Sequence, residues 1–385
     1  MKMTELLSPA KDKQTAFAAI DCGADAVYIG ATSFGARQNA ANSIEDIKEV
    51  VNYAHKYFVK VFVTVNTILT DKELEPAIKL IEELDKIGVD AILVQDMGLL
   101  KVLIEKCLDV PIHMSTQCDN RDIQKIEFFK NIGVSRVVLA RELSLAKICE
   151  IHEKVPDIEL ETFVHGALCV SYSGQCYLSH YIGGRSANRG ECAQPCRKKY
   201  SLINDDNKIL AKDIYALCLK DFNASEHLKE LVDSGVYSFK IEGRLKDINY
   251  VKNITAFYRQ GLDKYSKKAS SGRSLYNFVP NPEKSFNRGF TDYFLTGRKD
   301  CFNLLSPKSR GEYIGKVVNV TKNSIVVKTN KEIHKQDGMC FISANNIDGF
   351  IVNSVIQKPN GQLEIIPNKK NKVKYRRFII QKCRS

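Results

Sequence analysis

The chain has 385 residues, of which 44% are hydrophobic and 26% are charged, and its formal net charge is +12. This length suggests one large domain and a smaller one. No stretch approaches the ~18 consecutive apolar residues that span a membrane, so an integral membrane protein is not expected. The amino-terminal residues lack a charged-then-apolar export signal, and we therefore expect a cytoplasmic protein without a membrane partner.

Short β-branched, apolar runs alternate with amphipathic stretches in the first two thirds of the chain. Eight runs are predicted strands, at residues 4–9, 25–30, 60–66, 91–96, 111–116, 136–142, 159–166 and 237–244. Predicted helices between and after them include residues 44–57, 72–87, 122–132, 225–234 and 247–262. Eight strands, each followed by a helix, predict a (β/α)8 barrel of the TIM type, and a doubly wound open sheet is the alternative.

Polar side chains lie at or just after the ends of most of these strands. In a (β/α)8 barrel the active site forms at the carboxyl ends of the strands, so these side chains should meet. A helix cap or a loop hydrogen bond explains any one of them, but their repetition predicts a shared pocket. The candidate residues are Asn66, His113, Gln117, Arg141, His165, Glu242 and Arg244.

Four of the twelve cysteines, Cys169, Cys176, Cys192 and Cys196, fall within 28 residues of one another. They belong to a cysteine-rich segment, residues 161–197, that begins on the seventh predicted strand and should lie over the barrel mouth. In a reducing cytosol such a group is typical of a metal site or of catalysis rather than of disulfides. Structural zinc sites usually contain two close cysteine pairs, and only one is present here. The spacing therefore favours an iron–sulfur cluster over zinc, with unliganded thiols as a further alternative and Cys218 as a reserve ligand.

The composition changes after the predicted barrel, which we assign to residues 1–264. Residues 265–309 are rich in Lys, Ser, Asn, Gly and Pro, and their aromatic side chains predict a linker packed on the barrel. Residues 310–385 contain about six short strands separated by turns, which predict a small β-barrel.

The carboxyl-terminal residues 310–385 also hold most of the positive charge, with 15 Lys and Arg against 5 Asp and Glu. Concentrated positive charge on a small module favours binding of RNA, and a solubilising surface is the alternative. The candidate phosphate contacts are Lys372, Lys374, Arg376 and Arg377.

Three motifs resemble the signature of peptidase family U32, the collagenase-like proteins: ETFVHGALCVSYSGQC at 161–176, RSANRGECAQPCR at 185–197 and FKIEGR at 239–244. HMSTQ at 113–117, FGARQNA at 34–40 and FNRGFT at 286–291 extend the resemblance over most of residues 1–300. The better understood relatives are oxygen-independent hydroxylases that act on a tRNA wobble uridine, on a ribosomal RNA cytidine or on a quinone precursor. The resemblance implies a 4Fe-4S cluster on the four grouped cysteines and, for the tRNA branch, prephenate as the hydroxyl donor.

The basic carboxyl-terminal module favours an RNA substrate over a small quinone precursor, which gains nothing from added positive charge. The compact length and the small terminal barrel resemble the tRNA branch, in which 5-hydroxyuridine is formed, more than the ribosomal RNA branch. Arg37, Arg141 and Arg244 are predicted to bind the carboxylates of prephenate, since a guanidinium can grip a carboxylate with two hydrogen bonds. Asn66 and Gln117 are further predicted substrate contacts.

Three titratable side chains, His113, His165 and Glu242, are predicted proton carriers. A U32-type peptidase is the alternative activity, since His165 and Cys169 are near enough in sequence to form a thiol–imidazole pair. The chain has no GxSxG or HExxH motif, and the Cys169 thiol is needed as a cluster ligand, so peptidase activity is the second choice.

Overall fold

The computed structural model describes residues 1–36, 41–343, 346–359, 361–368 and 378–381. It divides into two compact units. The barrel unit comprises Met1–Pro195, Phe222–Pro280 and Thr291–Asp300, and the carboxyl-terminal unit comprises Cys196–Asp221, Asn281–Phe290 and Cys301–Ser385. The residues expected to form a linker, 265–309, contribute to both units.

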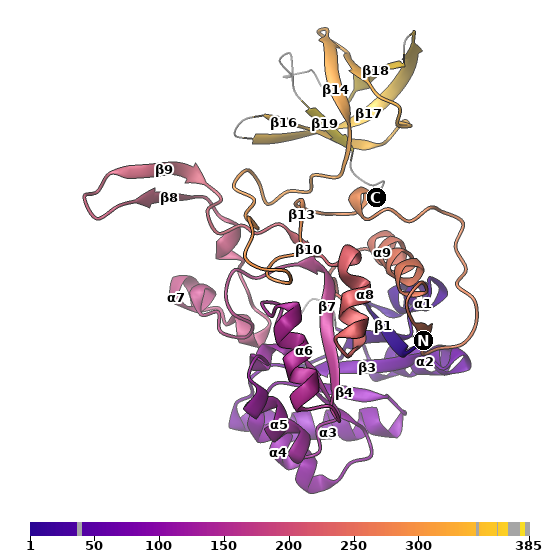
Figure 1. Cartoon of the computed structure of the whole chain (residues 1–385), viewed down its shortest axis with the longest axis vertical. Coiled ribbons are helices and arrows are strands. Elements are labelled where there is room, and N and C mark those ends of the chain that lie inside the picture. Colours follow the sequence, from indigo (N-terminus) through magenta and orange to yellow (C-terminus); the bar gives the residue numbers. More distant parts are fainter. Residues whose placement is uncertain (37–40, 344–345, 360, 369–377, 382–385) are drawn as a thin grey trace. The chain divides into compact units, whose positions relative to one another are not determined.

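Eight parallel strands form the closed barrel of the barrel unit (Figure 1), in which β11 pairs with both β7 and β1 and so completes the ring. The strands are β1 (Met3–Pro9), β2 (Ala26–Gly30), β3 (Lys60–Val65), β4 (Ala91–Val94), β5 (Ile112–Met114), β6 (Arg136–Val138), β7 (Glu159–Ala167) and β11 (Val236–Ile241). All eight predicted strands are present, which confirms the (β/α)8 barrel and excludes the open sheet. Strands β2 and β4 are buried along their whole length, as expected for strands covered on both faces.

Helices follow the strands and surround the barrel, except for α7, which belongs to the cysteine-rich segment. They are α1 (Lys13–Asp21), α2 (Ile44–Ala54), α3 (Asp71–Lys86), α4 (Met97–Lys106), α5 (Ile123–Asn131), α6 (Leu145–Lys154), α7 (Leu178–Gly183), α8 (Leu228–Asp233) and α9 (Ile248–Leu262). An Asp or Ser side chain accepts a backbone N–H at the start of six of them, for example Ser144 at α6 and Asp247 at α9. Helices α2, α3, α5, α8 and α9 match the residue ranges predicted for helices, whereas no range was predicted for α1, α4, α6 and α7. The sequence of α4, MGLLKVLIEK, is too uniformly apolar to show a clear period.

Short elements complete the architecture. The 3-10 helices are His55–Tyr57, Thr116–Cys118, Ala187–Arg189, Pro195–Arg197, Ser225–His227 and Pro282–Lys284. The short strands are β10 (Asp221–Asn223), β12 (Lys267–Lys268) and β13 (Phe290–Thr291). Among the described residues, no helix is both long and apolar enough to cross a membrane.

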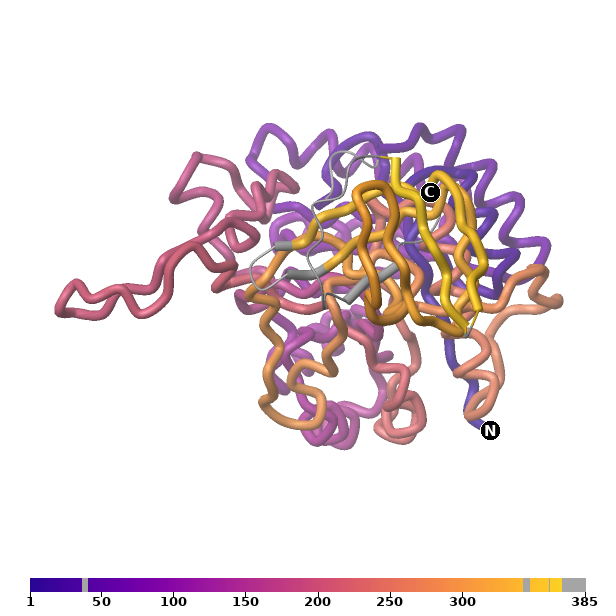
Figure 2. Tube along the Cα trace, turned by 90° about the horizontal axis from the view of Figure 1, so that it is seen from above, coloured from indigo at the N-terminus to yellow at the C-terminus, as the bar shows by residue number. Residues whose placement is uncertain are grey.

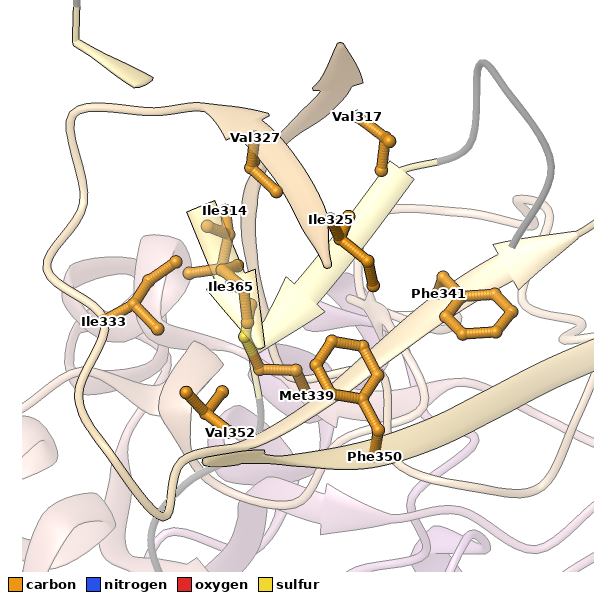
Figure 3. Packing of buried hydrophobic residues seen from close by; sticks show 10 residues of the cluster. All are labelled: Ile314, Val317, Ile325, Val327, Ile333, Met339, Phe341, Phe350, Val352 and Ile365. Carbon is orange, nitrogen blue, oxygen red and sulfur yellow. The ribbon is translucent and has the colours of Figure 1, made fainter. Parts of the chain in front are cut away.

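The carboxyl-terminal unit contains a second, antiparallel barrel in the order β14-β15-β18-β17-β16-β19. Its strands are β14 (Glu312–Val320), β15 (Ile325–Lys328), β16 (Gly338–Ser343), β17 (Asn346–Lys358), β18 (Gln362–Pro367) and β19 (Phe378–Gln381), which confirms the predicted six-stranded module. Aliphatic and aromatic side chains from facing strands, including Ile325, Met339 and Phe350, fill its interior (Figure 3). The unit also contains a hairpin that was not predicted, β8 (Tyr200–Ile203) and β9 (Ile209–Ile214), which forms an extended two-stranded arm (Figure 2).

Candidate active site

A pocket lies at the carboxyl ends of the barrel strands, where the sequence predicts it. Its walls come from β2, β3, β4, β7, β11 and the segments that follow β2, β3, β5, β6 and β11. The lining residues are Tyr28, Ala36, Thr64, Asn66, Leu93, Ser115, Thr116, Gln117, Arg141, Phe163, Lys240, Glu242 and Arg244. Five predicted site residues, Asn66, Gln117, Arg141, Glu242 and Arg244, are therefore brought together, because parallel strands present their carboxyl ends at one face.

Arg141 and Glu242 form an ion pair across this pocket. Arg141 Nη2 donates to Glu242 Oε2 at 2.6 Å, and both side chains are largely buried. The guanidinium carbon of Arg141 lies 3.8 Å from the centroid of the Phe163 ring. Arg141 Nε is buried and has no hydrogen-bond partner among the described residues. A buried donor without an acceptor is costly, which marks this side chain as one held in place for a purpose other than stability.

Hydrogen bonds also fix the other polar side chains of the pocket wall. Asn66 Oδ1 accepts from the Ala36 backbone N–H at 3.1 Å, and Asn66 Nδ2 donates to Ser115 Oγ at 3.1 Å. Ser115 Oγ also accepts from the Gln117 backbone N–H at 3.3 Å. Arg244 Nη1 donates to Thr64 Oγ1. The side-chain amide of Asn66 therefore holds the segment that follows β2 through its oxygen and the segment that follows β5 through its nitrogen.

Lys240 was missed by the sequence analysis, although it lies in the wall of the pocket. Its ammonium donates to Glu161 Oε1 at 2.7 Å and lies 4.5 Å from the Tyr28 ring centroid. Burial lowers the pKa of Lys240, while the Glu161 carboxylate opposes that shift. The missed signal was a charged residue at an inward position of a buried strand, where charges are rare unless they are paired.

A buried charge cluster in the barrel interior includes Glu161. Arg136 donates to Glu5 Oε1 at 2.6 Å and to Glu161 Oε2 at 3.1 Å, and Ser238 Oγ donates to Glu5 at 2.9 Å. Burial would raise the pKa of Glu161, but Lys240 and Arg136 hold it below the usual value. The cluster therefore keeps charged groups in the interior by pairing each with an opposite charge.

The two histidines predicted as proton carriers do not line the pocket. His113 lies in the barrel interior against the Phe62 ring, with a centroid distance of 4.9 Å. Burial lowers its pKa far below the ordinary value, and the charges of Arg136 and Lys240 add to this effect. His113 is therefore neutral, and its Nδ1 has no hydrogen-bond partner among the described residues.

His165 lies on the outer side of the barrel because β7 contains a bulge. The register of β7 against β11 shifts between Phe163 and His165, so that Phe163 faces the pocket while His165 packs against α9. His165 Nδ1 lies 3.2 Å from the Tyr258 hydroxyl. Burial lowers the pKa of His165 to about 3, with a smaller contribution from Lys246.

The cysteine-rich segment is held on the loops that follow β5 and β6. The Ser173 backbone N–H and hydroxyl both donate to the Glu142 carboxylate at 3.0 Å. Gly174 has a φ of +76° and lies so close to Gln117 that an added Cβ would be 1.9 Å from the Gln117 carbonyl oxygen. Only glycine fits there, because both the backbone conformation and the space exclude a side chain.

Further along the segment, Asn188 contacts the loop that follows β3, and Arg189 contacts this loop and the first turn of α3. Asn188 Nδ2 donates to the Gly174 carbonyl at 3.0 Å, and the Ile68 N–H donates to the Asn188 carbonyl at 3.3 Å. Arg189 binds Glu73 through both terminal nitrogens, at 2.7 and 2.9 Å. The segment is thus tied to three loops at the mouth of the barrel.

Three of the predicted cluster ligands, Cys169, Cys176 and Cys192, are free thiols of the barrel unit. Burial raises the pKa of Cys169, and the thiols of Cys176 and Cys192 are near enough to influence it further. The Gln194 N–H donates to Cys192 Sγ at 3.4 Å. Cys196 begins the carboxyl-terminal unit, to which Cys218 also belongs.

An all-sulfur donor set suits iron–sulfur or zinc binding in its chemistry. However, the described residues contain no group of three or more His, Cys, Asp or Glu side chains arranged to hold a metal. The donor types therefore fit a cluster, whereas the described arrangement is not a preformed centre. Cys218 Sγ accepts from Arg197 Nη1 at 3.0 Å and is buried in the carboxyl-terminal unit.

Five predicted substrate contacts lie outside the described residues. They are Arg37, Lys372, Lys374, Arg376 and Arg377.

Comparison with known proteins gives several extensive similarities. The chain is 49% identical over 374 residues to the 23S rRNA 5-hydroxycytidine C2501 synthase of Escherichia coli, which covers 94% of this chain and 56% of the relative. It is 37% identical over 345 residues to an uncharacterized protease of Methanocaldococcus jannaschii, with coverages of 85% and 83%. It is 34% identical over 337 residues to tRNA hydroxylation protein P1 of Bacillus subtilis, with coverages of 85% and 80%.

The chain spans just over half the length of the Escherichia coli relative. The sequence profile described as Peptidase family U32 matches residues 11–303, which include the barrel unit's pocket and the cysteine-rich segment. The chain therefore belongs to peptidase family U32.

Proposed function

We propose that this protein is an RNA hydroxylase that adds a hydroxyl group to a pyrimidine base without molecular oxygen. The observation that carries this proposal is the positive charge of the barrel pocket, whose walls contain Arg141, Lys240 and Arg244. Glu242 pairs with Arg141 and Glu161 pairs with Lys240, so the described residues of the site retain one excess positive charge. Such a pocket favours an anionic co-substrate and lies where (β/α)8 enzymes perform chemistry. Relatives named for hydroxylation of ribosomal RNA and of tRNA support an RNA substrate.

The anionic co-substrate that we propose is prephenate, a dicarboxylate. Arg141 and Arg244 would each bind one carboxylate, since a planar guanidinium matches the two carboxylate oxygens. The stacking of Arg141 on Phe163 supports this role, because it holds the guanidinium in place in the wall of the pocket. Asn66, Ser115 and Gln117 then form the neutral, polar wall against which the base is placed.

Proton transfer in the pocket falls to Glu242 and Lys240 in this proposal. Both line the pocket, whereas His113 and His165 do not. The lowered pKa of both histidines also works against a role as proton carriers near neutral pH.

We further propose a 4Fe-4S cluster bound by Cys169, Cys176, Cys192 and Cys196. When bound, such a cluster supplies a redox-active iron centre with Lewis acidity close to the barrel mouth. The segment that carries these cysteines is held by Glu142, which directly follows Arg141 in the chain. The conformation of the cysteine-rich segment and the position of Arg141 are therefore coupled through adjacent residues of the chain.

Two RNA substrates are candidates. The tRNA wobble uridine is the candidate that the relatives named for tRNA hydroxylation support, and the ribosomal RNA cytidine is favoured by the higher identity to the Escherichia coli synthase. The test is complementation of a bacterial strain that lacks its own RNA hydroxylases, followed by mass spectrometry of digested tRNA and 23S rRNA. We expect 5-hydroxycytidine or 5-hydroxyuridine in one RNA class, and neither product would contradict the proposal.

Variants separate the pocket from the cofactor in the same assay. Arg141→Ala should lose the hydroxylated base while iron and sulfide in anaerobically purified protein stay unchanged. Cys169→Ala should lose both the base and the iron. Arg298→Ala, a change at an exposed arginine, is the control and should keep both.

Peptidase activity is the second candidate, and the structure disfavours a His165–Cys169 catalytic pair. Burial raises the pKa of the Cys169 thiol and lowers that of His165, which opposes formation of a thiolate–imidazolium pair. Peptidase activity would nevertheless be established if the unmodified protein cleaved gelatin and Cys169→Ala did not.

A further inference from the structure

The cysteine-rich segment exposes three tyrosines to solvent. Tyr172, Tyr177 and Tyr181 are 54%, 63% and 89% exposed. Tyrosine is usually at least half buried, because its ring carries a large apolar area. Three strongly exposed rings within ten residues of chain therefore indicate a surface that binds a partner.

Two of these rings belong to the same turn of helix. The Tyr181 N–H donates to the Tyr177 carbonyl at 3.0 Å, so residues 177 and 181 are one helical turn apart and their side chains project from the same side of α7. Figure 1 shows α7 standing out from the barrel strands. Tyr172, on the preceding loop, is braced from one side by Arg121, whose guanidinium carbon lies 4.0 Å from the ring centroid.

The cationic groups beside these tyrosines favour a polyanion. The exposed Arg185 follows Tyr181 by four residues, and the guanidinium of Arg121 lies against the Tyr172 ring. A nucleic acid suits cationic groups placed beside exposed rings, because each phosphate carries a negative charge and each base has an aromatic face.

The anchoring of the segment links the tyrosines to the pocket. Gly174 packs directly on the backbone of Gln117, a residue of the pocket wall, and Glu142 holds Ser173 beside Tyr172. A strand of RNA stacked on the tyrosines would therefore run beside the pocket mouth. Unpaired bases stack on aromatic rings irrespective of their sequence, which leaves recognition of the target base to the pocket.

We propose that Tyr172, Tyr177 and Tyr181 form a stacking surface for the unpaired nucleotides that flank the target base. This inference rests on the proposed function, since it assumes an RNA substrate. It assigns the contact with single-stranded RNA to the barrel unit itself, in addition to any phosphate contacts made by the carboxyl-terminal module.

Binding of a fluorescein-labelled, pyrimidine-rich RNA of about 12 nucleotides, measured by fluorescence anisotropy with the full chain, tests the surface. Tyr181→Ala should weaken binding by about tenfold, since one base–aromatic stack contributes roughly 1–3 kcal/mol. Tyr181→Phe should bind within about twofold of the unmodified protein, because the ring is retained. Phe58→Ala is the matched control: Phe58 is 74% exposed but precedes β3, at the opposite end of the barrel strands.

Equal binding by Tyr181→Ala and Phe58→Ala would overturn the stacking surface. A change in oligomeric state of Tyr181→Ala, detected by light scattering without any change in RNA binding, would also overturn it and assign the tyrosines to a contact between protein chains. Failure of the proposed function gives a different result, because the unmodified protein would then leave tRNA and 23S rRNA without hydroxylated pyrimidines. If the unmodified protein produced these bases and Tyr181→Ala bound RNA as tightly as the unmodified protein, the stacking surface would be rejected and the proposed function would stand.

Discussion

The Lys240 ammonium donates to Glu161 Oε1 at 2.7 Å, which joins the wall of the pocket to the charge cluster in the barrel interior. The other carboxylate oxygen of Glu161 accepts from Arg136, and Arg136 in turn binds Glu5 on β1. Four strands of the barrel, β11, β7, β6 and β1, are thereby connected through charged side chains that are almost completely buried. The geometry of the pocket therefore depends on groups that lie beneath it.

Arg136→Met should destabilise the fold strongly. The substitution leaves Glu5 and Glu161 buried without their shared guanidinium, and removing one partner of a buried ion pair costs about 3–5 kcal/mol of unfolding free energy. Urea denaturation followed by circular dichroism measures the change. Lys130→Met is the control, because its partner Asp157 is largely exposed and the midpoint should hardly move. Similar midpoints for the two variants would contradict the importance of the cluster.

Stability should decrease as the pH falls from about 6.5 toward 3, in part because of His165. Burial lowers the pKa of His165 to about 3 in the folded protein, while an unfolded histidine titrates near ~6.5. The unfolded chain therefore binds one proton more in this window, and the stabilising contribution is complete only above it. His165→Gln should reduce the pH dependence of the unfolding free energy between pH 6 and 4, by up to about 1.4 kcal/mol per pH unit. His180→Gln, at an exposed site, should leave the dependence unchanged; an unchanged slope in His165→Gln would refute the assignment.

Gly174→Ala should displace the cysteine-rich segment. Its Cβ would collide with the Gln117 carbonyl oxygen, and alanine at a positive φ adds roughly 1–2 kcal/mol of backbone strain. Gly133→Ala is matched in conformation, since Gly133 has a φ of +94° but no atom within 4 Å of an added Cβ. Limited proteolysis should cut the segment faster in Gly174→Ala only. Equal cleavage of both variants would show that strain alone, and not the contact with Gln117, governs the segment.

Replacing Lys372, Lys374, Arg376 and Arg377 by glutamine should make RNA binding less dependent on salt. Removing one phosphate–side-chain interaction reduces the slope of log K against log salt by about 0.7 for single strands, because one fewer counterion is released on binding. Anisotropy titrations at several salt concentrations measure the slope. Replacing the exposed helix residues Lys72, Lys79, Lys86 and Lys101 by glutamine gives a control of equal charge. Equal slopes for the two fourfold variants would assign the positive charge of the carboxyl-terminal module to solubility.

The barrel and much of its pocket could be predicted because they depend on local patterns. Buried β-branched runs specify strands, and a parallel barrel necessarily gathers the residues that follow them, so Asn66, Gln117, Arg141, Glu242 and Arg244 were identified from their positions alone. The second barrel was equally predictable from short alternating strands and turns.

Other features depend on contacts between residues far apart in the chain, and only the tertiary structure decided them. His165 faces outward because the pairing of β7 with β11 introduces a bulge, which no pattern within β7 reveals. Lys240 and Glu161 become partners only when β11 closes the ring against β7, and Arg136 and Glu5 join them from two further strands. A buried charged side chain is stable only beside groups of opposite charge. Closure of the barrel, rather than proximity in the sequence, brings these groups together.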